Sequence, residues 1–218
     1  MATDLFFLEC VNPSCGFRFP LDLSVFEGNF CPHCSSSLRK VAPQIGQWQP
    51  KWSPPIGIRL FGVLDNIRSA HNVGSIFRTS EAAGISHLFL CGLTPSPVSN
   101  SALAKAALGA EDRVAWSANA NAVHVVGQLK SEGFQIIALE CTPQAQNLFS
   151  AHEAAMPPGK VALVVGNEPA GVDPGILALA DRTLYIPMAG QKTSINVSVA
   201  FGVAMYGLLS AWSVFNAD

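Results

Sequence analysis

Charged residues are scarce in this chain of 218 residues, where they make up 13% of the sequence, whereas hydrophobic residues make up 49%. An intrinsically disordered chain has the opposite composition, so disorder is excluded. A chain of this length can bury one substantial core plus a small accessory module. The composition therefore indicates a folded protein rather than a tail or a linker.

Two phosphate-binding motifs are also missing. The sequence has no GxGxxG segment after its first long apolar strand pattern and no GxxxxGK[ST] segment anywhere. A dinucleotide-binding Rossmann domain and a P-loop enzyme are therefore poorly supported. The same absence disfavours a metabolic nucleotide-binding enzyme.

No targeting segment is recognisable. The first residues contain an acid where a signal peptide needs bases, and their apolar run is too short, so we expect a cytoplasmic protein. The uncharged run over residues 194–217 is long enough to span a bilayer. It contains Asn196 and Ser198 and has no flanking basic cluster, so we expect a buried helix over residues 197–215 and no membrane contact.

The formal net charge of -2 hides an uneven distribution of basic residues. Residues 39–78 carry six bases and one acid, whereas acids exceed bases before and after them. This stretch could contact a polyanion, or it could be a solvated basic linker. The six bases are Arg39, Lys40, Lys51, Arg59, Arg68 and Arg78.

Four cysteines form two pairs near the N-terminus. Cys10 and Cys15 are separated by four residues, and Cys31 and Cys34 by two. Each pair brackets a tight turn, so each can supply two thiolates to one tetrahedral metal ion. Two disulfides are the alternative, but a reducing compartment disfavours them. The spacing predicts a structural zinc site in a module that is too small to fold without such a tie.

Proline and glycine are concentrated after this module. Residues 41–55 contain four prolines and a glycine, and we expect no regular structure there. Trp48 and Trp52 in this stretch could dock onto a neighbouring domain or stack on bases. The expected organisation is a zinc-ribbon module over residues 1–42, a linker over 43–56 and a main domain over 57–218.

Apolar runs typical of strands alternate with helical patterns from residue 58 onward. Strands separated by helices form a parallel sheet that is covered on both faces. The predicted fold class is therefore α/β, with a mostly parallel sheet between helices. We expect strands over residues 58–64, 87–91, 114–116, 134–139, 161–165 and 183–186, and helices over 70–83, 101–108, 121–130 and 197–215.

Two of these strands end in loops rich in glycine. The strand over 161–165 stops at Gly166, and the strand over 183–186 breaks at Pro187 into a loop with Lys192, Thr193 and Ser194. Ligands of open α/β sheets bind at this edge of the sheet. The active site is therefore expected there.

A third polar segment follows the first strand of the main domain. Asn72 can cap the helix over residues 70–83, and Arg78 follows six residues later. This combination suits an anion, and an arginine in this place is more typical of a phosphate or carboxylate clamp than of a catalyst. Glu168, in a turn bounded by glycines, could cap a helix or take part in chemistry.

Three segments at these positions resemble the signature motifs of one family. They are HNVGSIFRTSEAAG (71–84), VALVVGNEPAGV (161–172) and IPMAGQKTSINVSVAFG (186–202), and KAALGAEDRVAW (105–116) resembles a segment between them. Together they look like the SpoU (TrmH-like) RNA ribose 2'-O-methyltransferases of the SPOUT superfamily. The resemblance covers about residues 58–212, and Ile195, where the family usually has leucine, is its one small departure.

The resemblance implies a C-terminal deep trefoil knot that holds a bent S-adenosylmethionine largely through main-chain groups. A knot departs from the rule that connections do not thread loops, and periodicity does not reveal one. An apolar cleft with backbone donors and acceptors suits an adenine and a ribose. The positions that match the family's cofactor-binding residues are Leu139, Glu140, Gly166, Ile186, Met188, Ser194, Ile195 and Asn196.

The same resemblance implies an enzyme that methylates a ribose 2'-hydroxyl in tRNA or rRNA. Arg78 matches the arginine at the family's reacting centre, proposed as a base or as a clamp on the adjoining phosphate, and we favour the clamp because a guanidinium is nearly always protonated. Asn72, Glu168, Ser194 and Asn196 would position that arginine and the nucleotide. A catalytically inactive zinc-ribbon RNA-binding protein is the alternative, although these polar residues are all present.

The apolar C-terminal helix implies a homodimer, because family members pair through this element and one of its faces would otherwise lack a cover. Gly202, Ala204 and Gly207 would let two backbones approach closely. The pairing is expected to bring Arg78 and the N-terminal module of one subunit toward the cofactor loops of the other.

Overall fold

The computed structural model describes residues 4–46, 57–153 and 159–212. The chain divides into two compact units, Met1–Lys51 and Trp52–Asp218, and each has its own sheet. The predicted linker residues 47–56, which include Trp48 and Trp52, lie outside the described residues.

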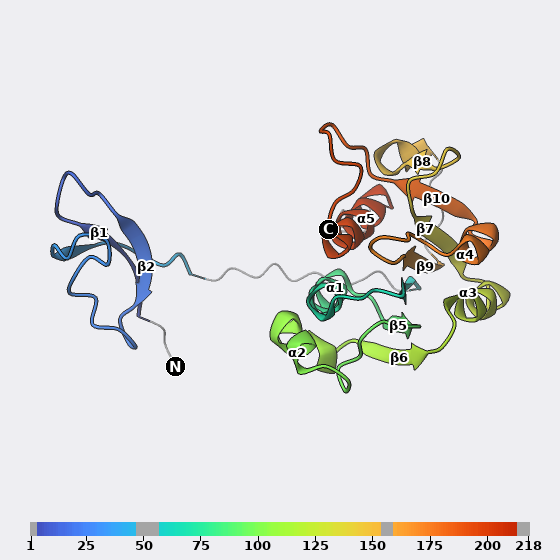
Figure 1. Cartoon of the computed structure of the whole chain (residues 1–218), viewed down its shortest axis with the longest axis horizontal. Helices are drawn as coiled ribbons and strands as arrows, with labels where there is room; N and C mark the ends of the chain where they lie inside the picture. The colour runs from blue at the N-terminus through green and yellow to red at the C-terminus, as the bar shows by residue number, and fades with distance from the viewer. Residues whose placement is uncertain (1–3, 47–56, 154–158, 213–218) are drawn as a thin grey trace. The chain divides into compact units, whose positions relative to one another are not determined.

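The smaller unit is a three-stranded antiparallel sheet, coloured blue in Figure 1. Its strands β1 (Leu5–Cys10), β2 (Arg18–Asp22) and β3 (Leu38–Pro43) lie in the order β2-β1-β3. Contrary to the expectation of irregular structure from residue 41, β3 continues to Pro43. A proline is tolerated there because β3 is an edge strand with a single neighbour.

The larger unit is built on a seven-stranded sheet in the order β6-β5-β4-β9-β7-β10-β8. All of its described strand pairings are parallel. The central strand β9 is buried at five of its six positions, as is typical of a strand covered on both faces. The strands are β4 (Arg59–Asp65), β5 (His87–Cys91), β6 (Ala115–Asn119), β7 (Gln135–Leu139), β8 (Gln146–Asn147), β9 (Lys160–Val165) and β10 (Arg182–Tyr185).

Helices cover both faces of this sheet (Figure 1). One face carries α1 (Ala70–Ala83), α2 (Ser101–Ala107) and α5 (Val197–Ala211), whose apolar side chains form one core cluster. The other face carries α3 (Ala122–Ser131) and α4 (Pro174–Leu179) with a second cluster. The 3-10 helices η1 (Ala110–Asp112) and η2 (Leu148–Glu153) are the remaining described helices. The predicted α/β sheet between two helical layers is confirmed.

The ends of α1 coincide with the predicted bounds, and its capping residues explain why. Ser69 accepts a hydrogen bond from the Asn72 N–H, and Gly84 ends the helix at a φ of 73°, a left-handed conformation that glycine adopts freely. The prediction that Asn72 caps this helix is wrong, because Asn72 is its third residue. The pattern did not predict α4 and β8, which span six and two residues and are too short for periodicity to show.

Helix α5 begins after Asn196, whose side chain accepts hydrogen bonds from the Ser198 N–H at 2.8 Å and the Val199 N–H at 3.4 Å. The last residues of the predicted helix, 213–215, lie outside the described residues. Within residues 4–46, 57–153 and 159–212, no helix is long and apolar enough to cross a membrane.

The small residues of α5 pack within the chain. Ala204 is fully buried, Gly202 faces Thr79 of α1, and Gly207 faces the side chain of Leu148. The prediction is therefore wrong for Ala204, which has no exposed surface, whereas Gly202 and Gly207 are partly exposed and their contact with a partner subunit stays a prediction. A helix face made of small residues can pack on its own domain as readily as on a second copy of the chain.

Strand β9 enters the sheet between β4 and β7, both of which precede it in the sequence. The chain then passes through β10 and the 186–196 segment to α5, which packs against α1. Strand order alone does not establish threading, so the trefoil knot stays a prediction.

Candidate functional site

A cavity of about 820 Å³ lies at the carboxyl ends of β7, β9 and β10. Its lining comes from segments 139–141, 165–171 and 185–197, together with Asn72 and Ala200. Small-molecule sites have volumes of roughly 300–1,000 Å³, and sheets of this kind bind ligands at this edge. The structure places around this cavity all the residues matched to cofactor-binding positions: Leu139, Glu140, Gly166, Ile186, Met188, Ser194, Ile195 and Asn196.

The loop after β9 forms a tight turn that makes one wall of the cavity. The backbones of Asn167 and Gly171 exchange hydrogen bonds of 3.0 and 2.8 Å. A Cβ atom on Gly166 would lie 2.3 Å from backbone atoms of Gly171 and Val172. Position 166 therefore accepts only glycine unless the turn opens.

Glu140 holds this turn from the end of β7. Its Oε2 accepts a hydrogen bond from the Val172 N–H at 2.8 Å, and its Oε1 accepts one from the Cys141 N–H at 2.9 Å. Its own N–H donates to the Leu184 carbonyl at 2.9 Å. One residue thus connects the ends of β7, β9 and β10, and its carboxylate shapes the wall of the cavity.

Three polar side chains connect the remaining segments at the cavity. Glu168 Oε1 accepts a hydrogen bond from Asn72 Nδ2 at 3.1 Å, and Asn72 Oδ1 accepts one from Asn196 Nδ2 at 2.9 Å. Asn196 Oδ1 is the group that caps α5. Each of the two side-chain amides donates through its nitrogen toward Glu168 and accepts through its oxygen on the other side, so every hydrogen bond in this series has one donor and one acceptor. It joins residues that are 96 and 124 positions apart in the sequence.

Glu168 also contacts the N-terminus of α1. Its two carboxylate oxygens accept hydrogen bonds from the Arg68 N–H at 3.0 Å and the Ser69 N–H at 3.2 Å. Partial burial acts to raise the pKa of Glu168, but these backbone bonds and the Asn72 amide outweigh it, and the pKa is lowered from 4.5. A carboxylate at a helix N-terminus is also favoured by the helix dipole. Glu168 thus holds the two residues that precede α1, while Ser69 remains the residue that caps the helix.

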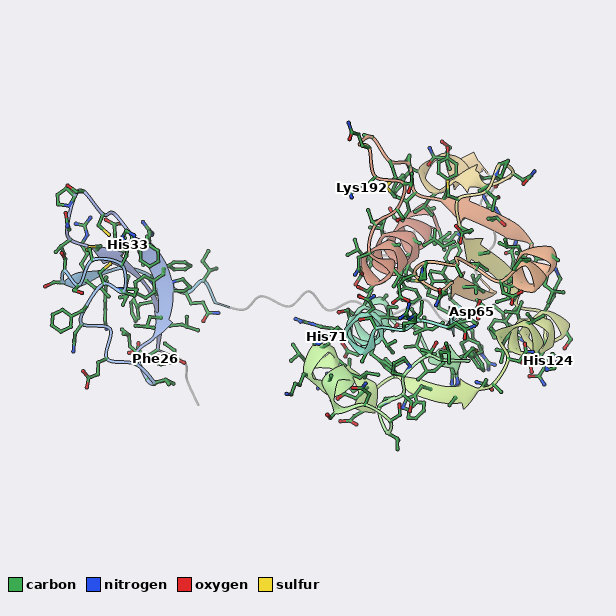
Figure 2. All side chains as sticks on the ribbon, in the orientation of Figure 1. Phe26, His33, Asp65, His71, His124 and Lys192 are labelled. Atoms are coloured by element: carbon green, nitrogen blue, oxygen red, sulfur yellow. The ribbon has the colours of Figure 1, made fainter. Side chains whose placement is uncertain are left out.

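Arg78 is the predicted site residue that the structure does not bring to the cavity. It is exposed on α1, about two turns beyond Asn72, and is not among the described residues that line the cavity. His71, Ser75 and Arg78 share one face of α1, because residues three and four apart are neighbours on a helix. Ser194, by contrast, lines the cavity from the exposed loop that also carries Lys192 (Figure 2).

Two residues that the sequence pattern did not single out support the turn from β4. Asp65, only 3% exposed, accepts hydrogen bonds from the Asp173 N–H at 3.2 Å and from Asn66 Nδ2 at 2.8 Å. The Asn66 carbonyl accepts one from Asn167 Nδ2 at 2.7 Å. Burial raises the pKa of Asp65, and the nearby charge of Asp173 adds to the effect. The sequence signal that could have identified Asp65 is an acidic residue at the end of an otherwise apolar strand.

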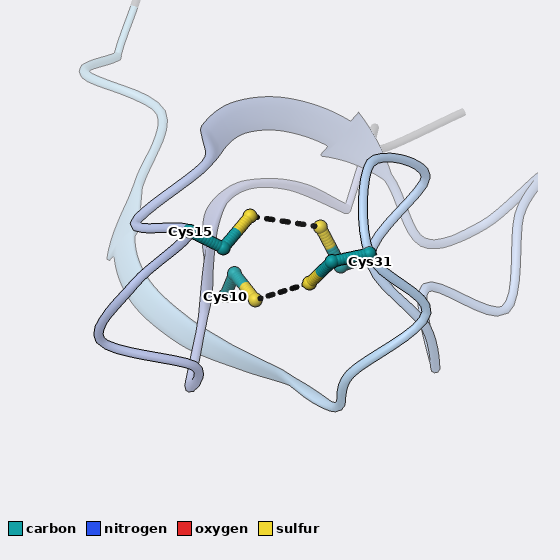
Figure 3. Close-up of side chains that lie close together, drawn as sticks. Cys10, Cys15 and Cys31 are labelled. Atoms are coloured by element: carbon teal, nitrogen blue, oxygen red, sulfur yellow. Dashed lines mark hydrogen bonds between the residues drawn. The ribbon is translucent and has the colours of Figure 1, made fainter.

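The smaller unit brings its four N-terminal cysteine sulfurs together (Figure 3). The sulfurs of Cys10, Cys15, Cys31 and Cys34 lie within 4.8 Å of one another. The Cys10–Cys34 distance is 3.4 Å and the Cys15–Cys31 distance is 3.8 Å, and none of the four forms a disulfide. Four sulfurs about 2.3 Å from a tetrahedral zinc ion would be about 3.8 Å apart. The geometry therefore fits a tetrahedral metal site.

A backbone N–H group is directed at one of these sulfurs. The His33 N–H donates a hydrogen bond to the Cys31 sulfur at 3.4 Å, and such a bond favours the thiolate form that binds a metal. The unit could hold one metal ion between its two turns.

A parallel sheet covered on both faces, with a cavity enclosed by loops at the carboxyl ends of its strands, defines an α/β ligand-binding domain. The chain belongs to the SpoU rRNA methylase family, whose model matches residues 59–206. The resemblance stated from the three sequence segments is confirmed. The smaller unit lies outside this match.

Individual relatives agree with the family assignment. The tRNA (guanosine(18)-2'-O)-methyltransferase of Aquifex aeolicus is 34% identical over 143 residues, which are 65% of this chain and 64% of that protein. The 23S rRNA (guanosine-2'-O-)-methyltransferase of Ralstonia nicotianae is 32% identical over 161 residues, which are 74% of this chain and 62% of that protein. The chain therefore spans less than two thirds of the length of these curated relatives.

Solved structures share the fold. The crystal structure of the Aquifex aeolicus TrmH/SpoU tRNA modifying enzyme has a TM-score of 0.61 and 31% identity, and the match covers 70% of this chain and 74% of that one. The sheet and its two helical layers are thus those of a known family fold.

Proposed function

We propose that this protein transfers a methyl group from S-adenosylmethionine to a ribose 2'-hydroxyl of tRNA or rRNA. The observation that carries the proposal is the hydrogen-bonded chain Glu168–Asn72–Asn196, which joins the three motif segments beside the cavity. Relatives named for the methylation of tRNA and of 23S rRNA support this reaction. Both RNA classes remain candidate substrates.

The groups around the cavity fit S-adenosylmethionine. The side chains of Leu139, Ile186 and Met188 offer an apolar surface to the adenine, and the three loops offer backbone donors and acceptors. The carboxylates of Glu140 and Glu168 suit a positively charged sulfonium. When bound, the cofactor supplies an electrophilic methyl group. The orientation of the ribose and the loss of its proton are left to the residues of the chain and to the RNA.

In this proposal Arg78 clamps the phosphate beside the reacting ribose. A guanidinium keeps its proton, so the neighbouring phosphate is the group that assists proton loss from the hydroxyl. Asn72, Glu168, Ser194 and Asn196 hold the loops and the nucleotide in line with the methyl group, and such alignment supplies much of the rate.

Because Arg78 does not line the cavity of its own chain, we propose a composite site in a homodimer, in which Arg78 of one subunit serves the cavity of the other. The outward side of α5 supports this pairing, since Val199 is 52% exposed and Tyr206 is 40% exposed. Helix α5 packs against α1, so the exposed sides of the two helices adjoin. Exposed apolar residues on a continuous surface favour a protein contact.

We also propose that Cys10, Cys15, Cys31 and Cys34 bind one structural zinc ion. The spacing of the sulfurs and the His33 N–H directed at the Cys31 sulfur support the assignment. Because the unit has so few buried residues, the metal would supply much of its stability. Reduced thiols suit the cytoplasmic location expected from the sequence.

A catalytically inactive RNA-binding protein of the same fold is the second candidate. It would keep the cavity without transferring a methyl group. The decisive experiment incubates the protein with S-adenosylmethionine labelled in its methyl group and total RNA, with and without ribonuclease. The enzyme proposal expects label in RNA that ribonuclease removes and that nucleoside analysis identifies as 2'-O-methyl; unlabelled RNA together with intact cofactor binding supports the inactive alternative. Mapping 2'-O-methyl sites in a strain lacking the protein then identifies the nucleotide.

A further inference from the structure

The smaller unit turns several phenylalanines outward although its core is very small. Phe26 is 58% exposed, Phe30 is 69% exposed and Phe17 is 41% exposed. Among the described residues of this unit, only Leu8, Cys10 and Cys31 are buried. A module of this size gains stability from every ring that it buries, so rings left outside indicate a binding surface.

Phe26 and Phe30 line a groove of about 420 Å³ together with Phe19, Leu21 and Pro32. Gly28, at a φ of 62°, lies at this groove. A Cβ atom there would be 2.8 Å from Leu23 and 3.0 Å from Leu8, so glycine lets the 23–30 loop pack down on the sheet. The loop is therefore held in place while Phe26 remains at the surface (Figure 2).

The groove continues into a row of aromatic rings. Phe19 and Leu21 share one face of β2, and Phe17 directly precedes the strand. The ring centroids of Phe17 and Phe19 are 5.3 Å apart, and Phe17 stacks on His33 with centroids 6.0 Å apart. We call this row the aromatic track and define it by His33, Phe17, Phe19, Phe26 and Phe30.

The polar groups of the groove suit the edge of a nucleobase. Glu27 and Asn29 are the polar residues that line it, and Asn29 Nδ2 donates to Glu27 Oε2 at 3.1 Å. A carboxylate accepts hydrogen bonds from an exocyclic base amine, and a carboxamide can both donate and accept. An aromatic groove with such groups combines the two elements by which single-stranded bases are bound.

The arginines and the lysine among the described residues of this unit already have partners. Arg18 and Arg39 pair with Glu9 at 3.4 and 2.6 Å, and Lys40 lies 4.5 Å from the centre of the Phe6 ring. Few phosphates can therefore be neutralised here. Binding at this unit would depend on stacking, and its salt dependence would be shallow because few counterions are released.

We propose that the aromatic track binds a single-stranded segment of the RNA substrate, with its bases stacked on the phenylalanine rings and one base in the groove beside Glu27 and Asn29. This inference rests on the proposed function only in taking RNA as the substrate. The track would hold an unpaired region of the RNA while the larger unit acts on the reacting ribose.

Direct binding tests the proposal. Full-length protein is titrated into a short fluorescein-labelled oligoadenylate and into a duplex RNA of the same length, and the anisotropy gives the Kd. Loss of one base stack weakens binding by about 1–3 kcal/mol, so Phe26→Ala should weaken oligoadenylate binding by roughly 5- to 150-fold. Val25→Ala is the matched control, since Val25 is 68% exposed but does not line the groove, and it should bind like the parent protein. Zinc content is measured for every variant to show that the unit is intact.

Two further substitutions identify the kind of partner. Phe26→Trp keeps a ring and should bind oligoadenylate at least as well as the parent, whereas Phe26→Leu keeps only apolar area and should bind like Phe26→Ala. Full binding by the leucine variant with weaker binding by the tryptophan variant would indicate an apolar protein partner and overturn the proposal. The proposal would also be overturned if the protein bound duplex RNA as tightly as oligoadenylate. It would be overturned as well if Phe26→Ala and Phe30→Ala both bound oligoadenylate like the parent protein.

Methyl-transfer kinetics separate this proposal from the proposed function. Phe26→Ala should raise the KM for RNA and leave the kcat and the affinity for S-adenosylhomocysteine unchanged. If the parent protein methylates no RNA, and the Phe26→Ala variant binds oligoadenylate more weakly than the parent, the proposed function is refuted and the aromatic track is supported. Normal methylation with unchanged oligoadenylate binding in that variant would refute the track alone.

Discussion

Replacing Gly166 by alanine tests how the turn after β9 forms the cavity. The added Cβ atom would lie 2.3 Å from backbone atoms of both Gly171 and Val172. Non-bonded carbon contacts favour roughly 3.5–4.0 Å, so the turn must open by more than about 1 Å. Backbone cannot rotate away as a flexible side chain can, and overpacking of this kind costs about 1–3 kcal/mol. Because the turn is a wall of the cavity, we expect the affinity for S-adenosylhomocysteine to fall by roughly 5- to 150-fold.

Isothermal titration with S-adenosylhomocysteine measures this loss, and thermal unfolding shows whether the domain remains folded. Gly190→Ala is the matched control, because Gly190 lies in the loop after β10 and a Cβ there has no neighbour within 4 Å. Its affinity should equal that of the parent protein. A Gly166→Ala variant with parental affinity and an unchanged Tm would show that the turn is not a rigid wall, and the reasoning would be refuted.

Four other outcomes are expected. Arg78→Ala should abolish methyl transfer while leaving the affinity for S-adenosylmethionine nearly unchanged, because Arg78 does not line the cavity; near-normal turnover would remove it from the reaction. Elemental analysis should give about one zinc per chain, and Cys31→Ser should unfold the smaller unit but spare cofactor binding, whereas a zinc-free, disulfide-bonded protein would contradict the metal site. Val199→Glu should convert dimers into inactive monomers in sedimentation, since Val199 is 52% exposed on α5; an active parent monomer would defeat the composite site. The pKa of Glu168 is lowered from 4.5 in the folded protein, so the stability that its charge contributes is complete above pH 4.5 and is lost as the pH falls through the folded-state pKa. The difference in urea midpoint between Glu168→Gln and the parent protein should therefore shrink in acid. A difference that stays constant with pH would exclude a role for the charge of Glu168.

The sequence by itself determined the elements whose signals lie within a few residues. Helix α1 spans residues 70–83 as predicted, because helical periodicity is a local property, although its N-cap is Ser69 and not the predicted Asn72. The cysteine spacing likewise predicted four converging sulfurs, since each pair brackets a short turn. The three motif segments pointed to the family without any knowledge of contacts.

Only the tertiary structure decided which side chains meet and which face of a helix is covered. Glu168 reaches Asn72 across 96 residues, and this contact depends on the packing of two strand ends rather than on any pattern within either segment. Gly202 and Gly207 of α5 face the chain's own Thr79 and Leu148, which the sequence did not reveal because periodicity identifies an apolar face but not what packs against it. Arg78 lies in a segment that reads as part of one site, yet α1 carries it away from the cavity, because a helix advances about 1.5 Å per residue along its axis and turns successive side chains in different directions.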